Sequence, residues 1–327
     1  MRIAVFPPGA EWSIPLLARE ETARERRSVN RLGERLLANP YLILALTALF
    51  WSGNHVLGRA IAGHIPPFGI SMARWLVGAI VLWPFAYKHV RRDWPVIRAH
   101  LPIIAFLALS GGALFGAGQY VGLQYTTALN VSVMNSLGPV LIAATATILF
   151  RDRLAPIQMA GIAVSFAGVL MIVTRGDPAV LAHLSFNIGD LIIMGNMMVW
   201  AIYCCFLRFK PRMHWLSFIW TFSAISGLAT LPVHVWEHSA GFPFRADWVT
   251  ALSVIYVAVF PSILAFLFWN RGVELIGANR AGAFLHLTPI YSAVLASVLL
   301  GEHLQLYHLI GFVLILAGVR FAAKKAP

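Results

Sequence analysis

Long apolar stretches recur along the chain from Tyr41 onward, each running for roughly 18 to 25 residues between short polar segments. As a helix, a stretch of this length covers the roughly 30 Å hydrocarbon thickness of a bilayer. Only helices and closed barrels satisfy their backbone in lipid, and these stretches are too long and too uniformly apolar for barrel strands. The pattern therefore predicts an all-α integral membrane protein with ten transmembrane helices. The predicted spans are 41–62, 66–87, 101–123, 127–150, 155–174, 188–208, 214–235, 248–271, 279–300 and 304–323.

The second half of the chain repeats the first at an offset of about 150 residues. An odd number of helices in each unit requires the second unit to enter the membrane in the opposite sense, as in the inverted repeats of many secondary transporters. We predict a first five-helix repeat over residues 41–175 and a second over residues 188–324. The aligned segments are WSGNHVLGR at 51–59 with WAIYCCFLR at 200–208, and LGPV at 137–140 with LTPI at 287–290.

Composition supports a membrane protein and argues against other classes. Hydrophobic residues make up 59% of the chain and charged residues 12%, whereas a soluble domain carries about 25% charge. The formal net charge of +12 comes from short basic clusters between apolar stretches, as in topology-setting loops, so no nucleic-acid partner is predicted. Cys204 and Cys205 are adjacent within an apolar stretch, which suits neither a disulfide framework nor a spaced metal site. The sequence predicts no metal and no cofactor.

Positive charge is distributed unevenly between the two sides of the predicted bundle. With residues 1–40 as a cytoplasmic tail, nearly all of the 25 Lys and Arg residues fall on the cytoplasmic side. The opposite side receives only Arg175 and Arg245, and Arg59 and Arg74 lie within predicted helices. Because Lys and Arg accumulate on the cytoplasmic face of membrane proteins, both termini are predicted to be cytoplasmic.

The chain resembles the drug/metabolite transporter superfamily, EamA type, over most of its length after the tail. The resemblance rests on the aromatic-small-polar start of the first helix at residues 51–54, on the mid-helix Arg74, and on a cassette that occurs twice, at 132–168 and 282–318. The cassette has small residues, Leu-x-Pro, an acidic residue and a glycine-rich helix. Its second copy has the usual Gly-acidic pair before the last helix, whereas the first has Arg151 and Asp152 in those places.

The resemblance implies the function and the location. It implies a multi-pass secondary transporter of the bacterial cell inner membrane that moves small organic solutes by alternating access, mostly as an exporter. Helices 1, 3, 4, 6, 8 and 9 would line a central cavity, with helices 5 and 10 outside it. The aromatic-rich helices are similar to those of YddG-type exporters of aromatic amino acids. The expected partners are a small-molecule solute and membrane lipid, and the expected oligomeric state is a monomer or a weak homodimer.

Polar and aromatic side chains within predicted helices mark the candidate solute site, because lipid-facing positions favour apolar residues. Trp51, Asn54 and His55 fall near one face of the first helix, and Trp200 and Tyr203 occupy matching positions in the sixth. These residues are predicted to form two pseudo-symmetric walls of one pathway; the alternative is that they only pack and bond neighbouring helices. The residues predicted to bind solute are Trp51, Asn54, His55, Tyr120, Ser132, Asn135, Trp200, Tyr203, Trp269 and His286.

Four further residues are predicted to have structural or gating roles. Pro139 and Pro289 each remove a backbone donor and free a carbonyl one turn earlier. Arg59 and Arg74 are expected to fix interhelical geometry, or to extend their charged ends to the membrane interface, rather than to bind solute.

The acidic residues bear on ion coupling. All 13 fall in the tail, in loops or near predicted helix ends, so no carboxylate is expected at the membrane centre. A proton- or sodium-driven carrier usually needs an ionisable or oxygen-rich group there, so transport without ion coupling, or coupling through histidine, is expected. The alternatives are proton-coupled multidrug or metabolite efflux, and an intramembrane enzyme acting on a lipid-linked substrate. The chain has no Walker phosphate loop and no nucleophile-elbow serine, so no enzyme is predicted.

Overall fold

A computed structural model describes residues 37–61, 65–122, 124–125, 134–152, 154–182, 187–300 and 305–324. Every regular element in these ranges is helical, in agreement with the predicted all-α class. The predicted tail, residues 1–40, lies outside the described residues except for 37–40. The elements of the first half are α2 (Pro40–Ala60), α3 (Pro67–Ala99), α4 (Leu101–Leu107), η1 (Ala108–Leu114), α5 (Phe115–Gly122), α7 (Gly138–Phe150), α8 (Pro156–Val173) and α9 (Ala179–Ala182).

The second half has the same order of helices. Its elements are α10 (Ile188–Phe206), η2 (Leu207–Phe209), α11 (Trp215–Ser239), α12 (Trp248–Val257), η3 (Ala258–Leu264), α13 (Ala265–Ile276), α14 (Ala278–Gly282), η4 (Ala283–His286), α15 (Leu287–Leu300) and α16 (Leu306–Ala322).

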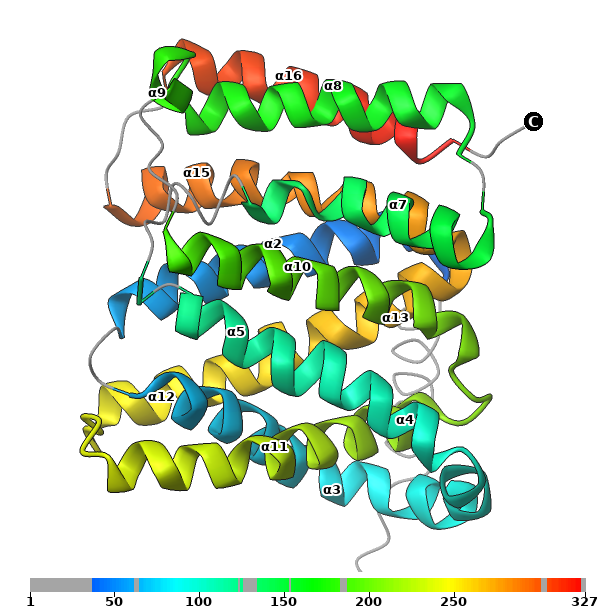
Figure 1. Ribbon diagram of the computed structural model, residues 1–327. Coiled ribbons are helices and arrows are strands. Elements are labelled where there is room, and N and C mark those ends of the chain that lie inside the picture. The colour runs from blue at the N-terminus through cyan, green and yellow to red at the C-terminus, as the bar shows by residue number, and fades with distance from the viewer. Residues whose placement is uncertain are drawn as a thin grey trace, which may run out of the picture.

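The helices are stacked in levels, and each level holds one helix from each half of the chain (Figure 1). α8 and α16 form the level at one edge, and α3 and α11 form the level at the opposite edge. Between these edges, α7 shares a level with α15, α2 with α10, and α5 with α13. The two helices of a level start about 150 residues apart, so the sequence repeat is matched by the arrangement in space.

The first helix of each half packs against helices of the other half. α2 packs against α13 and α15, and α10, the counterpart of α2, packs against α5 and α7. Each half therefore completes its core with helices of the other half, because a single unit leaves its apolar helix faces uncovered.

Two π-helical segments lie at corresponding positions of the halves. η1 spans Ala108–Leu114 and η3 spans Ala258–Leu264, an offset of 150 residues at both ends. In η3 the Ser262 hydroxyl donates to the carbonyl of Val257 at 2.6 Å. A π-segment widens the helix and leaves carbonyls available to side chains, and such segments are frequent at functional sites.

Helix lengths agree with membrane crossing for much of the chain. Among the described residues, six helices are long and apolar enough to span a bilayer, and α7 and α16 are shorter apolar helices. The largest departure from the sequence prediction is α3, predicted over 66–87, which runs to Ala99. The charged stretch after residue 87 stays helical because Val90, Asp93 and Ile97 are buried while the charged positions between them face outward.

Two carboxylates join α3 to α11. Glu237, near the end of α11, accepts hydrogen bonds from the backbone N–H groups of Phe68 and Gly69 in the first turn of α3, both at 3.0 Å. Asp93, toward the end of α3, accepts from the backbone N–H of His214 and from the hydroxyl of Ser217, both at 2.8 Å. Each helix thus supplies the carboxylate that caps the start of the other, where unsatisfied N–H groups favour an anion.

Candidate functional site

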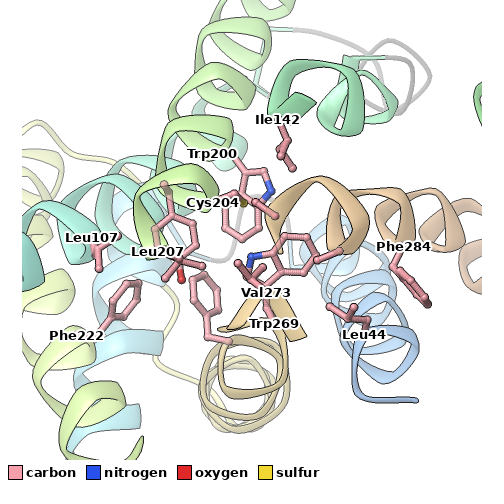
Figure 2. Packing of buried hydrophobic residues seen from close by; sticks show 14 of the residues in the cluster. Leu44, Leu107, Ile142, Trp200, Cys204, Leu207, Phe222, Trp269, Val273 and Phe284 are labelled. Atoms are coloured by element: carbon pink, nitrogen blue, oxygen red, sulfur yellow. The ribbon is translucent and has the colours of Figure 1, made fainter. Parts of the chain in front are cut away.

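Aromatic rings from several helices meet in the middle of the stack. We call Trp51 of α2, Trp200 and Tyr203 of α10, and Phe266 and Trp269 of α13 the central aromatic cluster. Its ring centroids lie 5.3 Å apart for Trp51 and Trp200, 5.4 Å for Trp51 and Trp269, and 5.4 Å for Trp200 and Trp269. Figure 2 shows Trp200 and Trp269 side by side at its centre. Four of the predicted solute-binding residues are thus brought together, at spacings typical of aromatic pairs.

Two tryptophans are anchored to the π-segments. The Trp51 indole donates to the carbonyl of Pro261 in η3 at 3.1 Å. The indole of Trp75, which lies on α3 beside Phe266, donates to the carbonyl of Gly112 in η1 at 3.1 Å. Both acceptor carbonyls belong to π-segments, so η3 and η1 fix the orientation of the two rings.

Tyr203 is fixed by an asparagine that the sequence analysis did not single out. Its hydroxyl donates to Asn270 Oδ1 at 2.9 Å, and Asn270 Nδ2 donates to the carbonyl of Phe266 at 2.6 Å. The Tyr203 ring covers Gly111 so closely that a Cβ there would lie 2.4 Å from a ring carbon. In the sequence, Asn270 is a polar residue within an apolar helix, next to Trp269, and this position could have marked it as an interior residue.

The substitution Gly111→Ala is expected to displace the Tyr203 ring and to lower stability by about 1–3 kcal/mol, the usual effect of overpacking. Tyr203→Ala removes the ring that the new methyl would meet. In a double-mutant cycle measured by thermal unfolding in detergent, Gly111→Ala should have little further effect once Tyr203 is alanine. Equal effects of Gly111→Ala in both backgrounds would contradict this packing.

Asn54, Tyr120 and Asn135, which are predicted to bind solute, take part in two hydrogen-bonded pairs. The Tyr120 hydroxyl of α5 donates to Asn54 Oδ1 of α2 at 3.2 Å. The Gln119 amide of α5 donates to Asn135 Oδ1 at 2.9 Å. Asn54, Tyr120, Gln119 and Asn135 are all partly exposed within the protein, unlike the fully covered rings of Trp200 and Trp269. These residues place amide and hydroxyl groups next to the central aromatic cluster.

His286 lies apart from these pairs and is fully buried. Its Nε2 lies 2.8 Å from the carbonyl of Ser136, to which it donates, and its Nδ1 lies 2.6 Å from the hydroxyl of Ser165. Both ring nitrogens are therefore occupied by protein groups, and the ring joins η4 to α8 and to the segment before α7.

The two prolines start helices rather than bend them. Pro139 lies in the first turn of α7, after a turn at Leu137, and Pro289 lies in the first turn of α15, after the 3-10 segment η4. Backbone N–H groups in the first turn of a helix have no acceptor within the helix, so proline, which has no N–H, fits there without loss of a hydrogen bond. The carbonyl that each proline was predicted to free, one turn earlier, thus falls at a helix junction.

Three other predicted residues, Ser132 and the side chains of His55 and Arg59, lie outside the described residues.

Arg74 is buried between helices, with 5% of its surface exposed. Its Nε donates to the Ser262 hydroxyl of η3 at 2.7 Å, its guanidinium lies 5.0 Å from the Trp75 ring centroid, and it shares a hydrogen bond with Tyr120. Arg74 therefore connects α3 to η3 and α5 and adjoins the Tyr120–Asn54 pair; the structural role expected for it stays a prediction.

Carboxylates in the described ranges lie in loops or toward helix ends. Asp190 is in the first turn of α10, where it accepts from the backbone N–H of Asn187 at 2.8 Å. Asp152 pairs with Arg208 beyond the end of α7, and Glu274 pairs with Lys210 at 3.5 Å. The expectation that no carboxylate lies at the membrane centre stays a prediction, and Glu302 lies outside the described residues.

Comparisons with known proteins identify relatives along most of the chain. The EamA-like transporter family matches it twice, over residues 39–174 and 187–323. The "Uncharacterized transporter YyaM" of Bacillus subtilis is 25% identical, with 87% of this chain and 93% of that protein covered. An "Uncharacterized transporter" of Archaeoglobus fulgidus is 27% identical over 87% and 97% of the two chains. The "Uncharacterized inner membrane transporter YicL" of Salmonella typhimurium is 24% identical over 85% and 93%.

One solved crystal structure has the same fold. It superposes with a TM-score of 0.68 at 20% sequence identity, over 87% of this chain and 96% of the other. The two family matches, the full-length relatives and the paired helices of the two halves agree with one another. The protein is a multi-pass membrane protein that belongs to the EamA-like transporter family.

Proposed function

We propose that the protein is a secondary carrier with ten membrane spans in two inverted repeats, over residues 41–175 and 188–324. In this proposal it moves a small organic solute through the middle of the helix stack by alternating access. Family membership and transporter-named relatives support transport in general. The paired levels of Figure 1 support two structurally similar halves.

A contact between repeat counterparts carries the proposal. Trp51 and Trp200 occupy matching positions of the two repeats, and their rings touch each other. Residues that meet their own counterparts lie on the axis that relates the halves. For inverted repeats this axis runs in the membrane plane, so the tryptophans lie near the bilayer midplane, equally far from both sides. Alternating access requires a site at this depth.

A second contact of the same kind supports the axis. His286 aligns with Ser136, and the His286 ring bonds the Ser136 carbonyl. The line through both contacts passes from the central aromatic cluster toward α8 and α16. A solute near this line would meet the rings of Trp51 and Trp200 and the polar groups of Asn54, Tyr120 and Asn135.

The chemistry of these side chains favours a flat, amphipathic solute such as an aromatic amino acid. Rings at 5–6 Å spacing provide stacking surface, and the amide and hydroxyl groups beside them orient polar atoms. We assign the inner membrane, cytoplasmic termini and net export to this carrier. The proposal includes no ion coupling, because the carboxylates of the described residues lie in loops or toward helix ends.

Counterflow tests the carrier. Purified full-length protein in proteoliposomes, loaded with unlabelled L-phenylalanine and given no ion gradient, should transiently accumulate labelled L-phenylalanine from outside. Asn54→Ala and Trp51→Phe should each lower this accumulation at least tenfold, because they remove a polar contact and an indole at the axis. Trp94→Ala is the matched control, since Trp94 lies exposed at the far end of α3.

The outcomes separate the classes of function. Counterflow that is absent for every protein amino acid would remove the amino-acid assignment. Flux that does not saturate would indicate a channel, and covalent change of the solute would indicate an enzyme. Full activity of both Asn54→Ala and Trp51→Phe would place the solute away from the axis.

A further inference from the structure

Arg74 has a charge with no carboxylate partner in the described part of the chain. The ion pairs there join Arg92, Arg208, Lys210, His234 and Arg271 to acidic residues, and none involves Arg74. Its hydrogen-bond partners, Ser262 and Tyr120, are both neutral hydroxyls. A guanidinium that is buried within a membrane protein is ordinarily paired or serves a transported or bound ion.

A second buried group points to the same place. The Ser71 hydroxyl lies one turn before Arg74 on α3, is fully covered, and has no hydrogen-bond partner. Both groups border Gly116 of α5: a carbon at its Cβ position would lie 3.2 Å from Ser71 Oγ and 4.0 Å from Arg74 Nη1. We call the Arg74 guanidinium and the Ser71 hydroxyl, beside Gly116, the anion subsite.

The two groups suit one anionic group. Ser71 Oγ and Arg74 Nη1 both come from α3 and flank Gly116, which has no side chain, and they lie close enough for the two oxygens of one carboxylate to contact both. The Trp75 indole, 3.6 Å from the Cβ position of Gly116, already donates to Gly112 and holds one wall. Arginine donors and a hydroxyl are the usual partners of a carboxylate.

The subsite is connected to the solute groups proposed above. Tyr120 shares a hydrogen bond with Arg74 and donates to Asn54, while Trp75 packs on Phe266 of the central aromatic cluster at 4.9 Å. Resting on the proposed carrier function, we propose that the transported solute bears a carboxylate that Arg74 and Ser71 bind, with its apolar body against the aromatic rings.

Arg74 has no counterpart in the second half. The matching position is Ala224, and the position that matches its partner Ser262 is Gly112. The positive charge therefore lies on one side of the pseudo-symmetric centre only. A single anionic group on the solute fits this asymmetry, whereas a cationic drug would meet an unpaired like charge.

A matched pair of probes tests the subsite. The probes are 3-phenylpropionate and its uncharged amide, titrated calorimetrically into the detergent-solubilised full chain at pH 7.5. The acid should bind at least tenfold more tightly than the amide. Arg74→Gln should weaken the acid at least tenfold and leave the amide unchanged. Gly116→Ala should do the same, because its methyl would lie 3.2 Å from Ser71 Oγ and would block a carboxylate from reaching that hydroxyl while Arg74 stays in place.

Gly195→Ala is the control, since a Cβ there meets nothing within 4 Å. If the Arg74→Gln variant does not fold, acid and amide binding to the Gly116→Ala variant tests the subsite. The proposal is overturned if the acid does not bind, if acid and amide bind alike, or if neither substitution affects the acid. Acid-selective binding without any counterflow would retain the subsite and refute the carrier. Phenylalanine counterflow with equal binding of acid and amide would retain the carrier and refute the subsite.

Discussion

Gly318→Ala is expected to disrupt the packing of α8 on α16 and to destabilise the protein by about 3 kcal/mol or more. A Cβ at Gly318 would lie 2.4 Å from the backbone nitrogen of Ser165 and 2.5 Å from the carbonyl of Gly161. Backbone atoms of a packed helix cannot rotate away as a flexible side chain can, so the whole helix would have to move. Without a hydrophobic driving force between helices in lipid, this close approach is a main source of their association.

Gly161 of α8, whose carbonyl faces Gly318, gives the same expectation. A Cβ at Gly161, whose counterpart is Gly311, would lie 2.4 Å from the backbone nitrogen of Ala322. Thermal unfolding in detergent should therefore show a lower midpoint for both Gly318→Ala and Gly161→Ala. Gly195→Ala supplies the control for added helix propensity, because its Cβ meets no neighbour within 4 Å. A midpoint for Gly318→Ala equal to that of Gly195→Ala would refute the direct backbone contact.

Glu237→Gln is expected to loosen the start of α3 and to lower stability by about 2–4 kcal/mol. The Glu237 carboxylate is 3% exposed, and each of its oxygens accepts one backbone N–H of α3 at 3.0 Å. In glutamine one oxygen becomes an NH₂ group, which opposes an N–H donor and leaves it unpaired. The charge that favours the helix N-terminus is lost as well.

The matched control is Glu274→Gln, since the Glu274 side chain is 50% exposed and its ion pairs lie at the surface, where such pairs contribute little. Asp93→Asn should have a smaller effect than Glu237→Gln, because both α11 donors bond the single oxygen Oδ2, which the asparagine carbonyl oxygen can replace. Hydrogen exchange should locate the two effects, with faster exchange at Phe68 and Gly69 for Glu237→Gln and at His214 for Asp93→Asn. Equal midpoints for Glu237→Gln and Glu274→Gln would argue against the cap.

Many residues of the candidate site could be predicted from the sequence. The repeat alignment pairs Trp51 with Trp200, and its offset of 150 residues pairs Ser136 with His286; both pairs touch in the structure. Trp269, Tyr203, Asn54, Tyr120 and Asn135 were selected because a polar or amphipathic side chain within an apolar helix needs a partner other than lipid. This rule identifies interior residues, but it does not say which interior residues face one another.

The residues missed were those whose role depends on a distant neighbour. Asn270 holds the Tyr203 hydroxyl across 67 positions, and Ser262 holds Arg74 across 188. Nothing in the sequence distinguishes Ser71 from the other serines, whereas the structure shows its hydroxyl buried beside Gly116. The same holds for His286, which the sequence marked as polar and the structure shows bonded at both ring nitrogens.

The sequence by itself determined the membrane-protein class, the helical elements and the repeat at about 150 residues, because bilayer thickness and backbone hydrogen bonding allow few alternatives. Only the tertiary structure decided the π-segments, the exchange of helices between the halves and the surroundings of Arg74. These features depend on which helix faces meet, and the contacts come from side chains far apart in the chain. Local periodicity and composition report burial, but they do not contain those pairings.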